Sequence, residues 1–133
     1  MWFSHHQKRN SLQAPVAGTY TVIPTATSPQ QIGLLAIQPT SPVINAPIDG
    51  DIISLSPSRL VINSLSNQHI ELRIDRPNFH NKCTWQVRVG DSVSPLTIVG
   101  TLYGSLKDVT IAVYRIDTIQ ATNWVSLVSC LRL

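Results

Sequence analysis

Short runs of alternating apolar and polar residues follow one another along most of this chain, and no window of about ten residues has helical spacing. The clearest run is residues 70–75, where Ile70, Leu72 and Ile74 alternate with three charged residues. Successive side chains of a β-strand point to opposite faces, so this run places its aliphatic residues on one face and its charges on the other. The pattern restricts the chain to folds built from short strands.

The other β-prone runs recur at intervals of roughly eight to twelve residues, which is typical of strands and turns in a sandwich or barrel. The run 109–116 is apolar on both faces, which predicts a bulge or a strand covered on both sides. We expect an all-β fold, an antiparallel β-sandwich or jelly-roll-like barrel of about seven to nine strands with an extended N-terminal arm. The β-prone runs are 19–23, 32–38, 43–45, 52–55, 60–65, 70–75, 83–89, 96–103, 109–116 and 124–131.

Proline is concentrated near the N-terminus: residues 1–48 hold six of the nine prolines and no Asp or Glu. Because proline lacks a backbone donor, strands punctuated by it suit sheet edges or an extended arm. We therefore predict a flexible tail over residues 1–17, an extended arm or edge strands over 18–48, and a β-sandwich core over 49–133. A turn at Gly50 marks the last boundary, because glycine after aspartate accepts a positive φ.

The charge distribution argues against a nucleic-acid partner. Charged residues make up only 13% of the chain, about half the usual share, and the net charge is +3. A protein that neutralises many phosphates needs clustered Lys and Arg. The densest basic group is interleaved with Glu71, Asp75 and Asp91. Its members are Arg73, Arg76, Lys82 and Arg88.

Neither a membrane helix nor a secretory leader is expected. No run approaches the ~20 apolar residues that span a bilayer, and the N-terminal ten residues lack the apolar region of a signal peptide. We expect a protein that stays in the cell or leaves it by another route. Cys83 and Cys130 are too few for a disulfide framework, so they are expected to be buried free thiols, with a single bridge as the alternative.

Metal sites and catalytic motifs are weakly represented. His80 and Cys83 have a ligand-like spacing with His69 nearby, but Cys83 shares the phase of core residues. Asp49 and Asp51 supply too few oxygens for a calcium loop. No nucleophile elbow, glycine-rich phosphate loop or zincin motif is present. We predict a protein that is not an enzyme and has no metal or cofactor; catalysis would need a pocket that joins His69 or His80 to an acid.

Aromatic residues offer an alternative function as a platform for sugar. Such a platform stacks rings on exposed aromatic side chains, whereas aromatic residues in sheets otherwise serve packing. Trp85 is excluded because its phase places it with core residues. The candidates are Phe79, Tyr103, Tyr114 and Trp124.

The N-terminal segment carries apolar residues that could anchor it to a partner. Two large aromatics at an exposed terminus leave apolar surface in water, and burial in a groove would recover about 2 kcal/mol each. The alternative is that they fold back on their own sheet. The predicted partner-binding residues are Trp2, Phe3, Tyr20, Val22, Ile32 and Leu34.

The combination of a proline-punctuated arm with a weakly charged β-module resembles, in architecture, the small single-jelly-roll and decoration proteins of virus particles. The resemblance implies a non-enzymatic structural protein, a minor capsid or decoration protein of a virion. We expect it to form a homo-oligomer or dock on a larger protein shell, with residues 1–48 supplying part of the contacts. Outside a virion, we expect it in the cytoplasm. The alternative is a carbohydrate- or ligand-binding β-sandwich module.

Overall fold

The computed structural model describes residues 11–76 and 82–117. Every secondary-structure element in these ranges is a β-strand. The all-β class is therefore confirmed. Ten strands occur in the described part of the chain, where about seven to nine were expected for the whole. They are β1 (Gly18–Tyr20), β2 (Gln31–Pro39), β3 (Val43–Asn45), β4 (Gly50–Ser56), β5 (Arg59–Ser64), β6 (His69–Asp75), β7 (Lys82–Trp85), β8 (Ser92–Val93), β9 (Ile98–Tyr103) and β10 (Thr110–Ile116).

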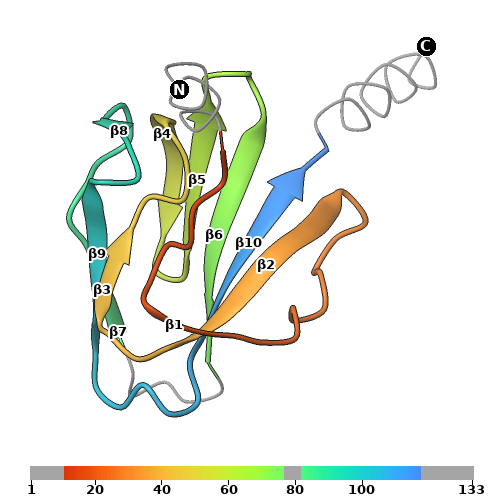
Figure 1. Cartoon of the computed structure of the whole chain (residues 1–133). Helices are drawn as coiled ribbons and strands as arrows, with labels where there is room; N and C mark the ends of the chain where they lie inside the picture. The colour runs from red at the N-terminus through yellow and green to blue at the C-terminus, as the bar shows by residue number, and fades with distance from the viewer. Residues whose placement is uncertain (1–10, 77–81, 118–133) are drawn as a thin grey trace, which may run out of the picture.

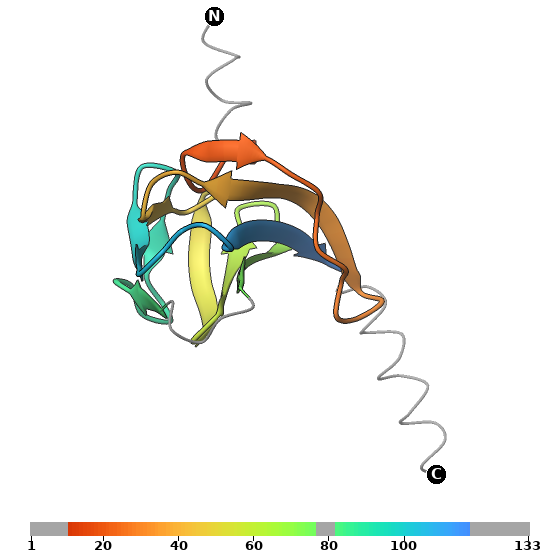
Figure 2. The ribbon, with the colours of Figure 1, turned by 90° about the horizontal axis from the view of Figure 1, so that it is seen from below.

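The strands form a large sheet and a small one, and all pairings are antiparallel (Figure 1). The seven-stranded sheet has the order β1-β2-β10-β6-β5-β4-β8, and the three-stranded sheet has the order β3-β9-β7. Figure 2 shows how strongly the large sheet is curled. Strands distant in sequence are neighbours, since β2 pairs with β10 and β10 pairs with β6.

The main hydrophobic core lies between the two sheets. Ile44 of β3 and Val99 of β9 come from the small sheet, and Leu72 of β6 and Ile111 of β10 come from the large one; all four are fully buried in a single cluster. Burial of one such side chain contributes roughly 1.5–3 kcal/mol, so this shared cluster holds the sheets together.

The predicted faces of two central strands are confirmed. The aliphatic residues of β6, Ile70, Leu72 and Ile74, are all buried in the core. On β10, Val113 belongs to the core cluster, whereas Tyr114 is buried on the opposite face, with a register shift against β2 between them. The apolar run 109–116 therefore has both predicted features, a bulge and cover on both sides.

The N-terminal residues that are described pack on the core. Val16 is buried in the core cluster, and backbone hydrogen bonds join Gln13 to Pro47 at 2.7 Å and Asn45 to Pro15 at 2.6 Å. Residues 11–17 are thus bound to the rest of the fold, where a flexible tail was predicted. Residues 1–10 of that tail lie outside the described part.

The three β-prone runs of the predicted arm are strands of the two sheets. β1 and β3 are terminal strands, as one of the two predicted alternatives had it. β2 instead lies between β1 and β10, and its proline is its last residue, where a missing donor interrupts the ladder least. An extended arm is not confirmed.

Gly50 has a different role from the one predicted. It is the first residue of β4 and does not have the positive φ of a turn, which occurs instead at Gly90 and Gly104. A Cβ at residue 50 would lie 2.3 Å from the carbonyl oxygen of Asn63, so glycine permits the close approach of β4 to β5. Asp49 and Asp51 flank this glycine, and such residues are typical of turns, so the sequence predicts a turn where a strand begins.

The strand bounds differ from prediction mainly between residues 83 and 98. β7 ends at Trp85, whose ring packs on the core while its indole nitrogen donates to the Ser56 carbonyl at 2.7 Å. β8 has only two residues and was not predicted. The predicted strand 124–131 lies outside the described residues. In the described part of the chain, no helix is long and apolar enough to cross a membrane.

Candidate functional site

Two of the predicted partner-binding residues are prominent on the surface. Tyr20, at the end of β1, is 68% exposed, and Val22, just after it, is 86% exposed. Ile32 is less exposed, and Leu34 packs against the core and is only partly accessible. Trp2 and Phe3 lie outside the described residues. Among the predicted partner-binding residues that the structure describes, Tyr20 and Val22 are therefore the most exposed.

β1 also presents an unpaired edge. It is the terminal strand of the large sheet, and in the described part of the chain its only strand neighbour is β2. A terminal strand leaves alternate backbone N–H and C=O groups free to pair with another chain. The Tyr20 and Val22 side chains border this edge, so backbone pairing and apolar contact are available at one place.

The loop after β1 covers the outer face of the large sheet, the face opposite the core. Ile23 packs against the small cluster formed by Ala36, Ala112 and Tyr114. The Tyr114 hydroxyl donates to the Pro24 carbonyl at 2.8 Å. The loop, residues 21–30, therefore buries part of the sheet face that lies opposite the main core.

Arg73 of β6 joins this loop to the sheet. Its Nη2 donates to the Tyr114 hydroxyl at 2.6 Å and to the Thr25 carbonyl at 3.2 Å, and it lies 3.8 Å from a carboxylate oxygen of Asp75. The guanidinium carbon is 4.6 Å from the centre of the Tyr114 ring, a cation–π distance. Burial raises the pKa of Tyr114, and the positive charge of Arg73 acts in the opposite direction.

A buried carboxylate lies on the same face two residues earlier. The Glu71 side chain is fully buried, and its Oε1 accepts from Arg59 at 2.9 Å and from Gln31 at 2.8 Å. Its Oε2 has no hydrogen-bond partner. Together with Arg73 and Tyr114, these residues form a polar layer beneath the outer surface of the sheet.

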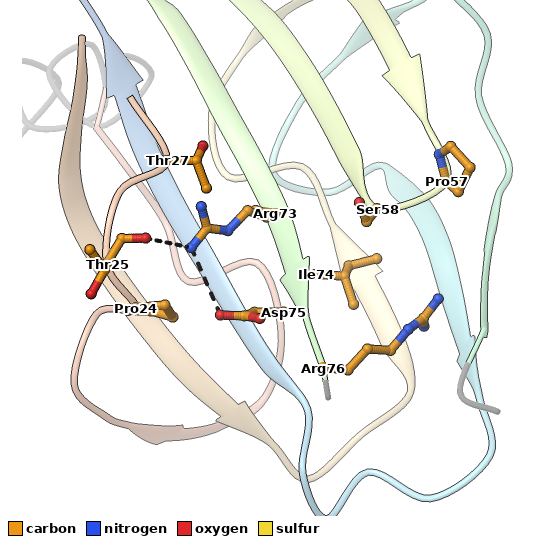
Figure 3. Close-up of a pocket in the computed structure, with 9 residues that line it drawn as sticks. All are labelled: Pro24, Thr25, Thr27, Pro57, Ser58, Arg73, Ile74, Asp75 and Arg76. Carbon is orange, nitrogen blue, oxygen red and sulfur yellow. Dashed lines mark hydrogen bonds and ion pairs between the residues drawn. The ribbon is translucent and has the colours of Figure 1, made fainter. Parts of the chain in front are cut away.

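A pocket of about 630 Å³ opens at the end of this layer (Figure 3). Three segments line it: the 21–30 loop, the turn between β4 and β5, and the C-terminal end of β6. Arg73 and Arg76 each have an Nη1 that is buried and has no hydrogen-bond partner. The lining residues are Pro24, Thr25, Thr27, Pro57, Ser58, Arg73, Ile74, Asp75 and Arg76.

The residues considered for metal binding are not brought together. His69 begins β6, at the other end of this strand from the pocket, and Asp51 accepts a hydrogen bond from Ser92 at 2.8 Å. In residues 11–76 and 82–117, no group of three or more His, Cys, Asp or Glu could hold a metal ion. His80 is outside these ranges, as is Cys130.

Cys83 behaves as a core thiol. It is a free cysteine that packs against the main cluster, in agreement with its predicted phase. Burial raises its pKa from 9.0 to about 11, and nearby Arg76 opposes this effect.

The aromatic platform is not assembled by the described residues. Tyr103 is exposed on β9 of the small sheet, whereas Tyr114 is fully buried on β10 of the large one. Tyr114 as an exposed sugar contact is therefore wrong, because the 21–30 loop covers it. Phe79 and Trp124 lie outside the described residues.

The pocket itself was missed by the sequence reasoning. The alternation in residues 70–75 predicts a strand with one charged face, and the mixed charges there argue against a nucleic-acid surface, but neither pattern indicates a pocket. The loop and the turn that complete the pocket are far from β6 in sequence. Their shared signal, a Pro24-Thr25 pair and a Pro57-Ser58 pair, has no fixed spacing to β6 that could have been recognised.

Comparison with known proteins assigns no family: no protein-family model matches the chain, and neither does any curated protein.

Proposed function

We propose that this protein is a non-enzymatic structural protein, a small β-sandwich that associates with copies of itself or with a larger protein shell. The single observation that supports this most is the unpaired edge of β1, bordered by the exposed side chains of Tyr20 and Val22. An edge strand of one copy can pair with the edge strand of another and continue the sheet between them.

The energetics of such an edge favour association. Backbone pairing satisfies groups that otherwise rely on water, and burial of each apolar side chain adds about 2 kcal/mol. Only 13% of the residues are charged, so few ions must be desolvated when two such surfaces meet.

The setting that we propose is a virus particle, with the chain as a minor capsid or decoration protein. An all-β fold, a low share of charged residues and a proline-rich N-terminal third support this setting. They are the features by which the chain resembles small capsid and decoration proteins, including the jelly-roll proteins among them.

Light scattering coupled to size-exclusion chromatography tests the association. The full chain is expected to elute as a dimer or larger assembly, and a Tyr20→Lys/Val22→Lys variant is expected to elute as a monomer, because lysines on an edge oppose pairing. The matched control is Leu65→Lys/Leu96→Lys, which places two lysines at exposed leucines outside β1.

A monomeric wild type, or an assembly that the lysines at residues 20 and 22 leave unchanged, would contradict the proposal. A monomer that binds glycans would favour the alternative of a carbohydrate-binding module. That alternative has less support, because Tyr103 and Tyr114 do not share a surface.

A further inference from the structure

The pocket at the end of β6 has an unbalanced positive charge. Arg73 and Asp75 form an ion pair at 3.8 Å and offset each other. Arg76 is absent from both ion pairs found among the described residues. Of the charged residues that line the pocket, two are cationic and one is anionic, so the lining has one excess positive charge.

The pocket also has donors without acceptors. Nη1 of Arg73 and Nη1 of Arg76 are buried, yet neither has a hydrogen-bond partner. A buried N–H of a charged group that lacks an acceptor is destabilising, and native proteins rarely leave such groups unpaired. Both residues line the same pocket, so a ligand carrying acceptor oxygens would satisfy them.

The two guanidinium groups lie on different sides of the pocket. Figure 3 shows the Arg73 side chain extending toward Thr25 and Thr27, and the Arg76 side chain extending away from them, with Ile74 between the two. Residues three apart on an extended strand point to opposite faces, which explains this divergence. The two groups therefore offer separate positions for a ligand's oxygens, one on each side of Ile74.

We propose that this pocket binds a small organic oxyanion, a carboxylic acid or a phosphate monoester. Its anionic group pairs with Arg76, whose charge is unmatched, and an uncharged oxygen accepts from Nη1 of Arg73, whose charge Asp75 already offsets. The Ser58 hydroxyl supplies a further polar contact, and Pro24 and Pro57 supply apolar walls. The volume of about 630 Å³ is that of a small-molecule site.

Amide chemical shifts of the full chain, measured during titration with sodium phosphate or sodium acetate, test the proposal. Sodium chloride at matched ionic strength is the baseline, so that general screening is subtracted. We expect saturable shifts at the amides of Ser58 and Arg76, because the anionic group is assigned to Arg76. Saturation by phosphate alone favours a phosphate monoester, by acetate alone a carboxylic acid, and by both a site that accepts either group.

The variant Arg76→Gln is expected to weaken binding by about tenfold or more, because a charge-assisted hydrogen bond is lost. The matched control is Arg88→Gln, which removes the same charge at an exposed residue outside the pocket and should bind as the wild type does. If Arg76→Gln does not fold, the proposal is judged from the wild-type titration alone, by whether the shifted amides lie at the pocket.

The proposal is overturned if neither anion gives saturable shifts, if the shifts scatter over the surface, or if Arg76→Gln binds as tightly as the wild type. These results are independent of the association through β1. The titration can be repeated in the Tyr20→Lys/Val22→Lys variant, whose substituted residues do not line the pocket.

Discussion

At the scale of single residues, the charged face of β6 shows how burial depends on partners. Glu71 alternates with aliphatic residues and is nevertheless fully buried. A carboxylate removed from water costs several kcal/mol unless hydrogen bonds compensate it. Arg59, which is half exposed, and Gln31 both donate to one of its oxygens, so this acid is kept in place by residues of two other strands.

Cys83 leads to a prediction about reactivity and pH. Because burial raises its pKa from 9.0 to about 11, the folded protein keeps the thiol protonated where an unfolded chain forms thiolate. In a Cys130→Ser chain, alkylation by iodoacetamide near neutral pH should be slow until denaturant is added. The folded state binds this proton more tightly, so the contribution to stability is present below pH 9.0 and is lost as the pH rises toward about 11.

Two measurements check this prediction. Alkylation is followed by mass spectrometry with and without denaturant, and urea unfolding is measured across the alkaline range. Rapid alkylation of the folded protein would show that the thiol is accessible. A Cys83→Ala chain provides the control for the pH effect, because the part of the alkaline loss due to this thiol should be absent from it.

At the scale of elements, the 21–30 loop acts as a cover for β10 and β6. Its only large apolar anchor is Ile23, and its polar anchors are the carbonyls of Pro24 and Thr25. Tyr114 takes part in both kinds of anchor, since its cluster packs against Ile23 while its hydroxyl accepts from Arg73 and donates to Pro24. This hydroxyl is therefore one of the groups that hold the loop, and the pocket wall that it forms, against the sheet.

Tyr114→Phe should loosen this cover. The substitution keeps the ring but leaves the Pro24 carbonyl and a donor of Arg73 without their partner, which should lower the free energy of unfolding by about 1–2 kcal/mol. Urea unfolding measures the loss, and hydrogen exchange should be faster in residues 21–30 than in the wild type. The matched control is Tyr103→Phe, which removes an exposed hydroxyl on the small sheet and should change neither.

At the scale of the whole molecule, the distribution of strands determines where association can occur. β8 ends the large sheet with two residues, and β1 ends it with three residues that include the exposed aromatic side chain of Tyr20. β1 is the longer of the two edges and has an exposed aromatic side chain within the strand, so it is the edge that we expect to pair.

If copies associate through β1, thermal stability should depend on protein concentration. Only the folded chain can present this edge, so mass action stabilises it, and a tenfold increase in concentration should raise the Tm by about a few degrees. Differential scanning calorimetry at several concentrations measures this. The Tyr20→Lys/Val22→Lys variant should lose the dependence, and Leu65→Lys/Leu96→Lys should keep it; a constant wild-type Tm would argue against the association.

Much of the fold could be predicted because local patterns carry it. The alternation in residues 70–75 places Ile70 and Leu72 in the core, and the two-faced run of β10 indicates its bulge and its cover. β8 could not be predicted, because its pairing with β4 depends on where the preceding loop returns. The pocket could not be predicted from the sequence for the same reason, because Thr25, Ser58 and Arg76 belong to three segments that meet only in the fold.

The sequence by itself determined most of the strands and the faces of β6 and β10, because side-chain alternation acts between neighbours in the chain. Only the tertiary structure decided that Gly50 serves close packing, that Glu71 is buried, and that Arg76 faces a pocket. Those outcomes depend on contacts between residues far apart in sequence, such as the loop laid over β10 and the pairing of β2 with β10. No local pattern records which distant segment will cover a given face.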